Sequence, residues 1–289
     1  MDQNSKEQEI LTLTLTIANI FSSLGSIFII VAYVTMKKSL FSLRLVVYMT
    51  IADLLHSISL IIPPTSNTLC LIQGILLQFT SASSVLWSAI MAFSIFNASI
   101  RNDNNVEGKE NIFLVVGYIF PLILTILPVI TDSYGYSQGW CWIKPADHGV
   151  IWRLVCFYAV LFFVIIFNLS VYGFVYGKIR QEILNIPDEE AQKVNRDLLT
   201  RLKFYPIILI FCYTTVTIMR MCEMFNSNIN IFWFTLASGL SVSLLGLLNS
   251  IAYGLSKDVR EHLKFLLCKK KTRHSSPFDP NPTTGSINS

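Results

Sequence analysis

Seven long stretches of the sequence are almost free of charged residues. They span residues 10–36, 43–62, 70–100, 112–131, 150–177, 202–225 and 231–254, and each has 20 residues or more. A helix of that length crosses about 30 Å of hydrocarbon at about 1.5 Å per residue. Inside a membrane every backbone polar group must bond within the protein, which favours helices. The sequence therefore predicts an all-α membrane protein with a seven-transmembrane helix bundle over residues 10–255.

Composition separates this chain from soluble proteins and from most enzymes. Only 14% of the 289 residues are charged and 53% are hydrophobic, whereas a soluble domain has about 25% charged residues. Buried helices of a soluble protein do not account for seven such stretches. The sequence has no glycine-rich phosphate-binding loop, and its four histidines are scattered without metal-ligand spacing. We therefore expect no catalytic site, no metal site and no cofactor.

The basic residues indicate how the bundle is oriented. If the N-terminus is outside, all but four of the 22 lysine and arginine residues fall on the cytosolic side; the exceptions are Lys6, Lys144, Arg153 and Arg220. Since cytosolic loops carry the excess of basic residues, we expect residues 1–9 to be an extracellular N-terminus and the C-terminus to be cytosolic. The net charge of +4 then reflects this topology and attraction to anionic lipid, and no nucleic-acid partner is expected.

The chain after the seventh stretch has two parts. Residues 256–268 place apolar and basic residues near helical spacing, which predicts a short amphipathic juxtamembrane helix, the eighth helix. Cys268 precedes three lysines and is either a palmitoylation site or an unmodified thiol. Residues 269–289 are rich in Ser, Thr, Pro and Asn and are predicted to be a disordered cytosolic tail.

Two cysteines fall on the outer side in this topology. Cys70 begins the third stretch, and Cys141 lies in the second outer loop, so both face an oxidising space. A disulfide between them would hold the loop over the outer mouth of the bundle. Trp140 and Trp142 flank Cys141; each is either an interfacial aromatic or a lid over a ligand pocket.

Four motifs resemble one receptor family. GSIFIIVAY at 25–33 followed by RLVVYMTIAD at 44–53, GWCWI at 139–143, RLKFYPIILIFC at 201–212 followed by IMR at 218–220, and LLNSIAYG at 247–254 occur in order on the expected spans. They are similar to the cyclic-AMP-receptor-like (class E) family of seven-transmembrane G-protein-coupled receptors. The resemblance covers about residues 15–265. It implies a plasma-membrane receptor that conveys an extracellular small-molecule signal to a heterotrimeric G protein on the cytosolic face.

The chain differs from the large rhodopsin-like receptor family. It has SIR at 99–101 where that family has an acidic-arginine-aromatic triplet, and Ser250 stands where that family has proline. Mechanistic detail from rhodopsin-like receptors therefore does not carry over.

Polar residues within the predicted spans are candidates for an activation switch. Asp53 lies halfway along the second span, where an ionised group costs about 2.5–3.5 kcal/mol. We expect Asp53 to face Asn249 and Ser250 of the seventh span through water. The alternative is a static polar contact between helices, worth about 0.6 kcal/mol.

Two further residues have alternatives of the same kind. Tyr253 follows Asn249 by four residues, on the same helix face, and is either a moving part of the switch or an interfacial aromatic. Pro206 is either a pivot of the sixth helix or only an entry residue.

Other polar and aromatic residues are ligand-pocket candidates. Arg220 and Glu223 lie on one face of the outer end of the sixth span, and they either bind an anionic, cyclic-nucleotide-like ligand or pair with each other. The further candidates are Lys144 and Arg153 near the second outer loop, and Gln73, Gln78 and Trp87 on the third span.

The sequence thus predicts a receptor in the lipid bilayer whose partners are an extracellular ligand and a G protein. The alternative is a seven-span transporter or channel. That class requires a path of ionisable groups or matching halves with broken helices, and Asp53 stands nearly alone at mid-depth.

Overall fold

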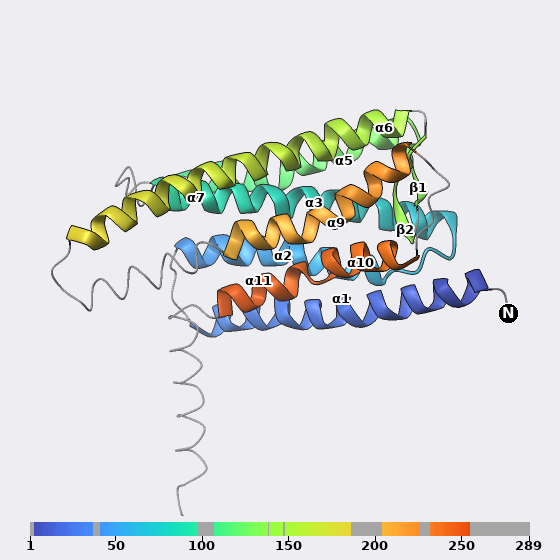
Figure 1. Cartoon of the computed structure of the whole chain (residues 1–289), viewed down its shortest axis with the longest axis horizontal. Helices are drawn as coiled ribbons and strands as arrows, with labels where there is room; N and C mark the ends of the chain where they lie inside the picture. Colours follow the sequence, from blue (N-terminus) through green and yellow to red (C-terminus); the bar gives the residue numbers. More distant parts are fainter. Residues whose placement is uncertain are drawn as a thin grey trace, which may run out of the picture.

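A computed structural model describes residues 3–36, 41–97, 107–137, 139–146, 148–185, 204–225 and 232–254. The predicted eighth helix at 256–268, Cys268 and the tail at 269–289 lie outside these residues. The helices run side by side along one common direction, and a small β-hairpin covers the end of the bundle at which α1 begins (Figure 1).

The helices follow the apolar stretches closely. The first three are α1 (Gln3–Met36), α2 (Phe41–Ile61) and α3 (Asn67–Phe96). The fourth stretch forms η2 (Glu107–Lys109), α4 (Glu110–Leu114), η3 (Val115–Ile119) and α5 (Phe120–Ile130). The fifth forms α6 (His148–Arg153), η4 (Leu154–Tyr158) and α7 (Ala159–Asn185), and the last two form α9 (Phe204–Phe225), α10 (Phe232–Ser243) and α11 (Leu245–Gly254).

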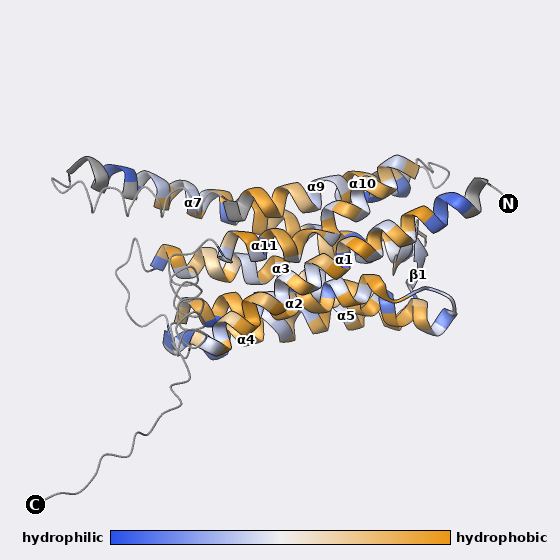
Figure 2. Cartoon of the chain, turned by 90° about the horizontal axis from the view of Figure 1, so that it is seen from below, coloured by the Kyte–Doolittle hydropathy of each residue, from blue (hydrophilic) through white to orange (hydrophobic). Residues whose placement is uncertain are grey.

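Six helical segments among the described residues are long and apolar enough to cross a membrane. They are 6–36, 43–61, 67–96, 107–130, 148–178 and 232–254. The expected sixth stretch forms α9, which is not one of these six. Hydrophobic residues predominate along the helices, and the start of α1 is hydrophilic (Figure 2). The chain is therefore a multi-pass, mostly helical membrane protein.

Local sequence explains where several helices begin and end. α1 starts at Gln3, earlier than the apolar stretch at residue 10. Two prolines at 63 and 64 follow α2, and they favour an extended chain. Ser66 then caps α3, its hydroxyl accepting a hydrogen bond from Leu69 N at 3.2 Å. The seventh stretch is interrupted at Leu244, between α10 and α11.

Two π-helical turns, η3 and η4, interrupt the fourth and fifth segments. Ser83 Oγ of α3 donates to Gly117 O in η3 at 2.6 Å, and Gln78 Nε2 of α3 donates to Cys156 O in η4 at 3.1 Å. A Cβ atom at Gly117 would overlap the Trp87 indole. Each wide turn therefore presents a carbonyl oxygen to α3, and η3 also makes room for a tryptophan.

The hairpin consists of β1 (Tyr134–Ser137) and β2 (Trp140–Ile143), antiparallel, with Tyr136 opposite Cys141. Gly139 in its turn has φ +95°, a conformation that favours glycine. The Tyr134 hydroxyl donates to Thr125 O at 2.9 Å, and burial raises the pKa of that hydroxyl. All four side chains of β2 are buried, so the hairpin forms one end of the largest apolar cluster among the described residues.

Candidate functional site

A disulfide and one glutamine attach the hairpin to α3. Cys70 and Cys141 form the disulfide, with their Cα atoms 5.3 Å apart. Cys141 N donates to Gln73 Oε1 at 2.7 Å, and Gln73 Nε2 donates to Ile62 O at the end of α2 at 2.8 Å. The loop is therefore fixed to α3, covalently and by a hydrogen bond, and Gln73 in turn joins α3 to the residue that follows α2.

A second glutamine joins the hairpin to η4. Trp142 Nε1 donates to Gln78 Oε1 at 2.9 Å, and Gln78 Nε2 donates to Cys156 O. Gln78 is fully buried. One α3 side chain thus connects the indole of the hairpin with the wide turn that precedes α7, so displacement of the indole would break a contact between these segments.

Behind the hairpin lies a buried cluster of charges: Arg153 of α6, and Arg220 and Glu223 of α9. Glu223 Oε2 accepts from Arg153 Nη1 at 2.9 Å and from Arg220 Nη1 at 3.1 Å. Ser137 Oγ of β1 donates to Glu223 Oε1 at 2.5 Å and accepts from Arg153 Nη2 at 2.7 Å. Arg220 and Glu223 therefore do pair, as one alternative expected, but Arg153 shares the same carboxylate.

Arg220 keeps unused hydrogen-bond donors in this cluster. Its side chain is 1% exposed, and its guanidinium carbon lies 4.5 Å from the Trp140 ring centroid. Within the described part of the chain, Nε and Nη2 of Arg220 have no hydrogen-bond partner. Two guanidinium groups against one carboxylate leave an excess positive charge. Buried, unpaired donors on a cation are costly, and an anion is the chemistry that would satisfy them.

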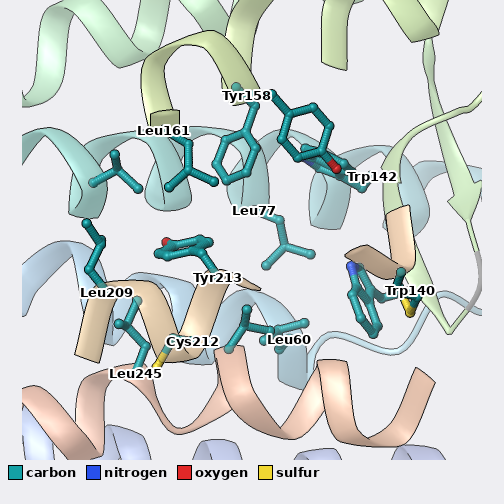
Figure 3. Packing of buried hydrophobic residues seen from close by; sticks show 14 of the residues in the cluster. Leu60, Leu77, Trp140, Trp142, Tyr158, Leu161, Leu209, Cys212, Tyr213 and Leu245 are labelled. Atoms are coloured by element: carbon teal, nitrogen blue, oxygen red, sulfur yellow. The ribbon is translucent and has the colours of Figure 1, made fainter. Parts of the chain in front are cut away.

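A small cavity of about 40 Å³ lies beneath the hairpin. Its walls consist of five aromatic, four aliphatic and three polar residues: His56, Leu60, Leu77, Ser81, Trp140, Trp142, Phe157, Tyr158, Tyr213, Val216, Arg220 and Val242. Figure 3 shows Trp142 and Tyr158 near one another, with Leu77 between them and Tyr213. Both tryptophans are 6% exposed, so the two indoles face inward.

His56 and Ser81 at the floor of the cavity lie next to a second group of polar residues, which includes Asp53 and Ser84. His56 Nδ1 of α2 lies 3.3 Å from Ser81 Oγ of α3. Asp53 precedes His56 by three residues and Ser84 follows Ser81 by three, and Asp53 Oδ1 accepts from Ser84 Oγ at 2.7 Å. Residues three apart on a helix are neighbours on one face. The two contacts therefore join α2 and α3 at positions one helical turn apart.

Asp53 is tied to a third helix by a direct contact. Asn249 Nδ2 of α11 donates to Asp53 Oδ2 at 2.8 Å, which replaces the water bridge expected from the sequence. Ser250 does not join them: its hydroxyl donates to Gly246 O, one turn earlier in α11, and it lies beside Gly25 of α1. Ser250 follows Asn249 by one position, which turns it by about 100° around the helix.

Other predicted residues lie elsewhere. Trp87 is fully buried but does not line the cavity; it packs against Tyr48 and Tyr118, with ring centroids 5.3 Å away in each case. It follows Ser81 by six residues and so lies about 9 Å deeper in the bundle. Lys144 does not line the cavity either; it is partly exposed, 3.9 Å from Asp132.

The two remaining switch candidates lie on α9 and α11. The Tyr253 hydroxyl lies between two sulfur atoms, 3.2 Å from Met91 Sδ and 3.7 Å from Met49 Sδ, inside the bundle. Pro206 lies in the first turn of α9 as described. The first turn of a helix tolerates proline because its N–H groups have no intrahelical partner.

Sequence reasoning missed several residues of the site. His56, Tyr158 and Tyr213 line the cavity, and Ser137 joins the charged cluster. His56 carries a usable signal, since it stands three residues after Asp53 on the same helix face. The tyrosines carry none, because aromatic residues are frequent throughout the spans.

Comparison with known proteins identifies similar chains. A family model described as slime mold cyclic AMP receptor matches residues 2–259. G-protein coupled receptor 1 of Arabidopsis thaliana is 30% identical over 266 residues, which cover 88% of this chain and 80% of that one. Cyclic AMP receptor-like protein A of Dictyostelium discoideum is 27% identical over 266 residues (89% and 68%). Cyclic AMP receptor 2 of the same organism is 24% identical over 190 residues (63% and 49%).

Proposed function

Because the chain belongs to the slime mold cyclic AMP receptor family, and is a receptor of the G-protein-coupled type, we propose that it couples an extracellular small molecule to a heterotrimeric G protein. The ligand binds in the cavity beneath the hairpin, and the G protein docks at the opposite end of the bundle. The observation that carries this proposal is that Arg220, which lines that cavity, has two donor nitrogens without a partner among the described residues.

The proposal includes a topology. α9, formed by the sixth apolar stretch, completes the set of seven spans, since it packs beside α7, α10 and α11 within the bundle (Figure 1). The N-terminus and the hairpin are extracellular, as the placement of basic residues and the disulfide both favour. The C-terminus is then cytosolic, and the plasma membrane is the compartment in which such a receptor meets its ligand.

The ligand is proposed to be anionic, with a flat ring. Arg220 supplies the positive charge, while Trp140, Trp142 and Tyr158 supply aromatic surface, and His56 supplies a polar group at the floor. Two of the similar proteins are named for cyclic AMP, a molecule of this chemistry. Small-molecule pockets usually measure about 300–1,000 Å³, far above the cavity here. Binding therefore requires the indoles to move.

Movement of the indoles provides a route into the bundle. Trp142 is bonded to Gln78, which also bonds η4. At the cavity floor, the His56–Ser81 contact lies one turn above the Asp53–Ser84 contact. We propose that ligand entry shifts α3 against α2 and thereby repacks Asp53, Asn249 and Tyr253. A two-state rearrangement of this kind is what signalling across a bundle needs.

The test is guanine-nucleotide exchange on co-expressed G proteins, in membranes with and without the chain. The panel contains cyclic nucleotides, other nucleotides, sugars and amino acids. We expect one anionic compound to raise exchange, and Arg220→Gln to lower its potency by about 10-fold or more, the loss of a charge-assisted hydrogen bond. The matched control is Lys144→Gln, which removes a nearby base outside the cavity.

Two results would contradict the proposal. Unchanged potency in Arg220→Gln would contradict the proposed anion site but would leave the proposed receptor function standing. No exchange from chain that is confirmed at the cell surface would favour the seven-span transporter or channel, and uptake of the same compounds would then be measured.

A further inference from the structure

A second and larger hollow lies between α3 and α7, away from the hairpin. Its volume is about 700 Å³. Phe93 and Phe96 of α3 form one wall, and Phe167, Val171 and Phe174 of α7 form the other. We call it the α3–α7 groove. Neither the ligand cavity nor the Asp53 cluster includes any of these residues.

The groove opens toward the surroundings of the bundle. Phe174 is 68% exposed, and Ser170, Gly173 and Gly177 on its α7 wall are exposed as well. These residues lie in the segment 148–178, one of the six that can cross a membrane. An apolar surface at that depth is covered by hydrocarbon, because no water is available to cover it.

Two glycines widen the groove. A Cβ atom at Gly173 or at Gly177 would meet nothing within 4 Å. No close approach of another described segment therefore explains why these positions lack side chains. Their effect is to leave a channel along α7 that is bordered by phenylalanine rings and is suited to a flexible chain of methylene groups.

The groove has one charged end. Lys178 lines it and is the last residue of the membrane-crossing segment, and Gln181 follows one turn later. An amine at this depth lies at the level of lipid headgroups, where long basic side chains extend toward the interface. In the topology proposed above, on which this inference rests, that end is cytosolic, and the cytosolic leaflet carries the anionic lipids.

We propose that the α3–α7 groove is a binding site for an anionic phospholipid of the cytosolic leaflet. One acyl chain lies along Gly173 and Gly177 between the phenylalanines, and the headgroup phosphate is bound by Lys178 and Gln181. The occupant is a lipid because the groove combines an apolar, membrane-facing channel with Lys178, the one basic residue among the described residues that line it, at the depth where that channel ends.

The test uses the full chain in nanodiscs of phosphatidylcholine with a small fraction of phosphatidylserine. The phosphatidylserine carries a photoactivatable group near the end of one acyl chain. We expect adducts to concentrate on peptides that contain residues 93–96 and 167–177. Both leaflets of a nanodisc carry the probe, so the result depends neither on the orientation of the chain nor on its extracellular ligand.

Variants separate the headgroup from the acyl chain. Lys178→Gln is expected to lower phosphatidylserine adducts about fivefold, the ratio expected for one basic residue at an anionic surface. Arg180→Gln, an exposed base of α7 that does not line the groove, is the control and is expected to leave them unchanged. Gly177→Leu fills open space and is expected to abolish adducts in the groove while thermal unfolding stays the same.

Three results would overturn the proposal. A phosphatidylcholine probe that labels the groove equally well would show that the headgroup is not selected. Adducts spread evenly over exposed faces such as that of α1 would show general lipid contact only. Adducts that join two copies of the chain through α7 would show that the groove is a protein interface.

Discussion

The molecule buries charge in two regions that solve the same problem differently. Around Asp53, one carboxylate receives a hydrogen bond at each oxygen, from Ser84 and from Asn249. Around Glu223, one carboxylate serves two arginines, and Arg220 retains two nitrogens without a partner among the described residues. The inner region is closed and satisfied. The outer region borders a cavity and carries an excess positive charge, because two arginines face one carboxylate.

That difference separates two roles within one bundle. A satisfied polar group holds helices in one arrangement and changes only when they move. A buried cation with unused donors has free energy to gain from an incoming anion. The outer region is therefore the proposed receiver of the ligand, and the inner region is the proposed element that responds one helical turn below it.

The largest effect is expected in the outer region, from Glu223→Gln. This change leaves Arg153 and Arg220 buried without a countercharge, and breaking a buried pair costs about 3–5 kcal/mol. Thermal unfolding of the purified protein in detergent should show a large loss of stability, partly reversed by an added anionic ligand. A shift as small as that of Lys144→Gln, a partly exposed base, would show that Glu223 does not balance the charge of the two arginines.

Loss of the disulfide is expected to be the next largest effect. Cys70 and Cys141 are 71 residues apart, and a cross-link over such a loop contributes about 4 kcal/mol in a chain-entropy model. Cys70→Ser with Cys141→Ser should destabilise the protein and abolish ligand-stimulated exchange, since the hairpin supplies both cavity indoles. Cys222→Ser, which removes a free thiol, is the control. Full ligand response without the disulfide would contradict the role of the fixed loop.

In the inner region, Asp53→Asn is expected to separate signalling from stability. The new amide keeps the shape of the carboxylate but has only one acceptor oxygen. Its NH₂ group therefore faces the donor of either Ser84 or Asn249. Contacts of this kind contribute about 0.6 kcal/mol on average in membrane proteins, so unfolding should change little. Guanine-nucleotide exchange should nevertheless be lost at normal surface expression. Normal exchange would leave Asp53 as a static contact between helices.

The smallest effect is expected from Ser84→Ala, which removes one of the two donors to Asp53. Stability should fall by about 0.6 kcal/mol, and ligand potency should shift by less than about threefold, the ratio that corresponds to that free energy. Ser88→Ala is the control: it makes the same change one turn further along α3, where the hydroxyl accepts from Asn168 of α7 and does not contact Asp53. A loss of exchange as complete as in Asp53→Asn would show that the α2–α3 contact, rather than the contact with α11, carries the signal.

The helical segments could be derived from the sequence, but their side-chain contacts could not. Long uncharged stretches predict helices because a membrane permits few other structures. The two π-helical turns could not be predicted from the sequence, because the carbonyl groups of Gly117 and Cys156 bond to Ser83 and Gln78 on another helix, α3. Trp87 and Lys144, which the sequence suggested as pocket residues, do not line the cavity beneath the hairpin, because a linear pattern gives neither the depth of a side chain in the bundle nor its direction.

The helical membrane class of the chain and its receptor family could be inferred from the amino-acid sequence, because hydrophobic length and ordered motifs are local properties. The sequence also singled out Cys70 and Cys141, since topology placed two cysteines on one side. Two contacts become evident only once the helices are packed: Arg153 and Arg220 share the Glu223 carboxylate, and Asn249 rather than Ser250 reaches Asp53. These contacts join residues 70 and 196 positions apart, and only the packing of helices brings such positions together.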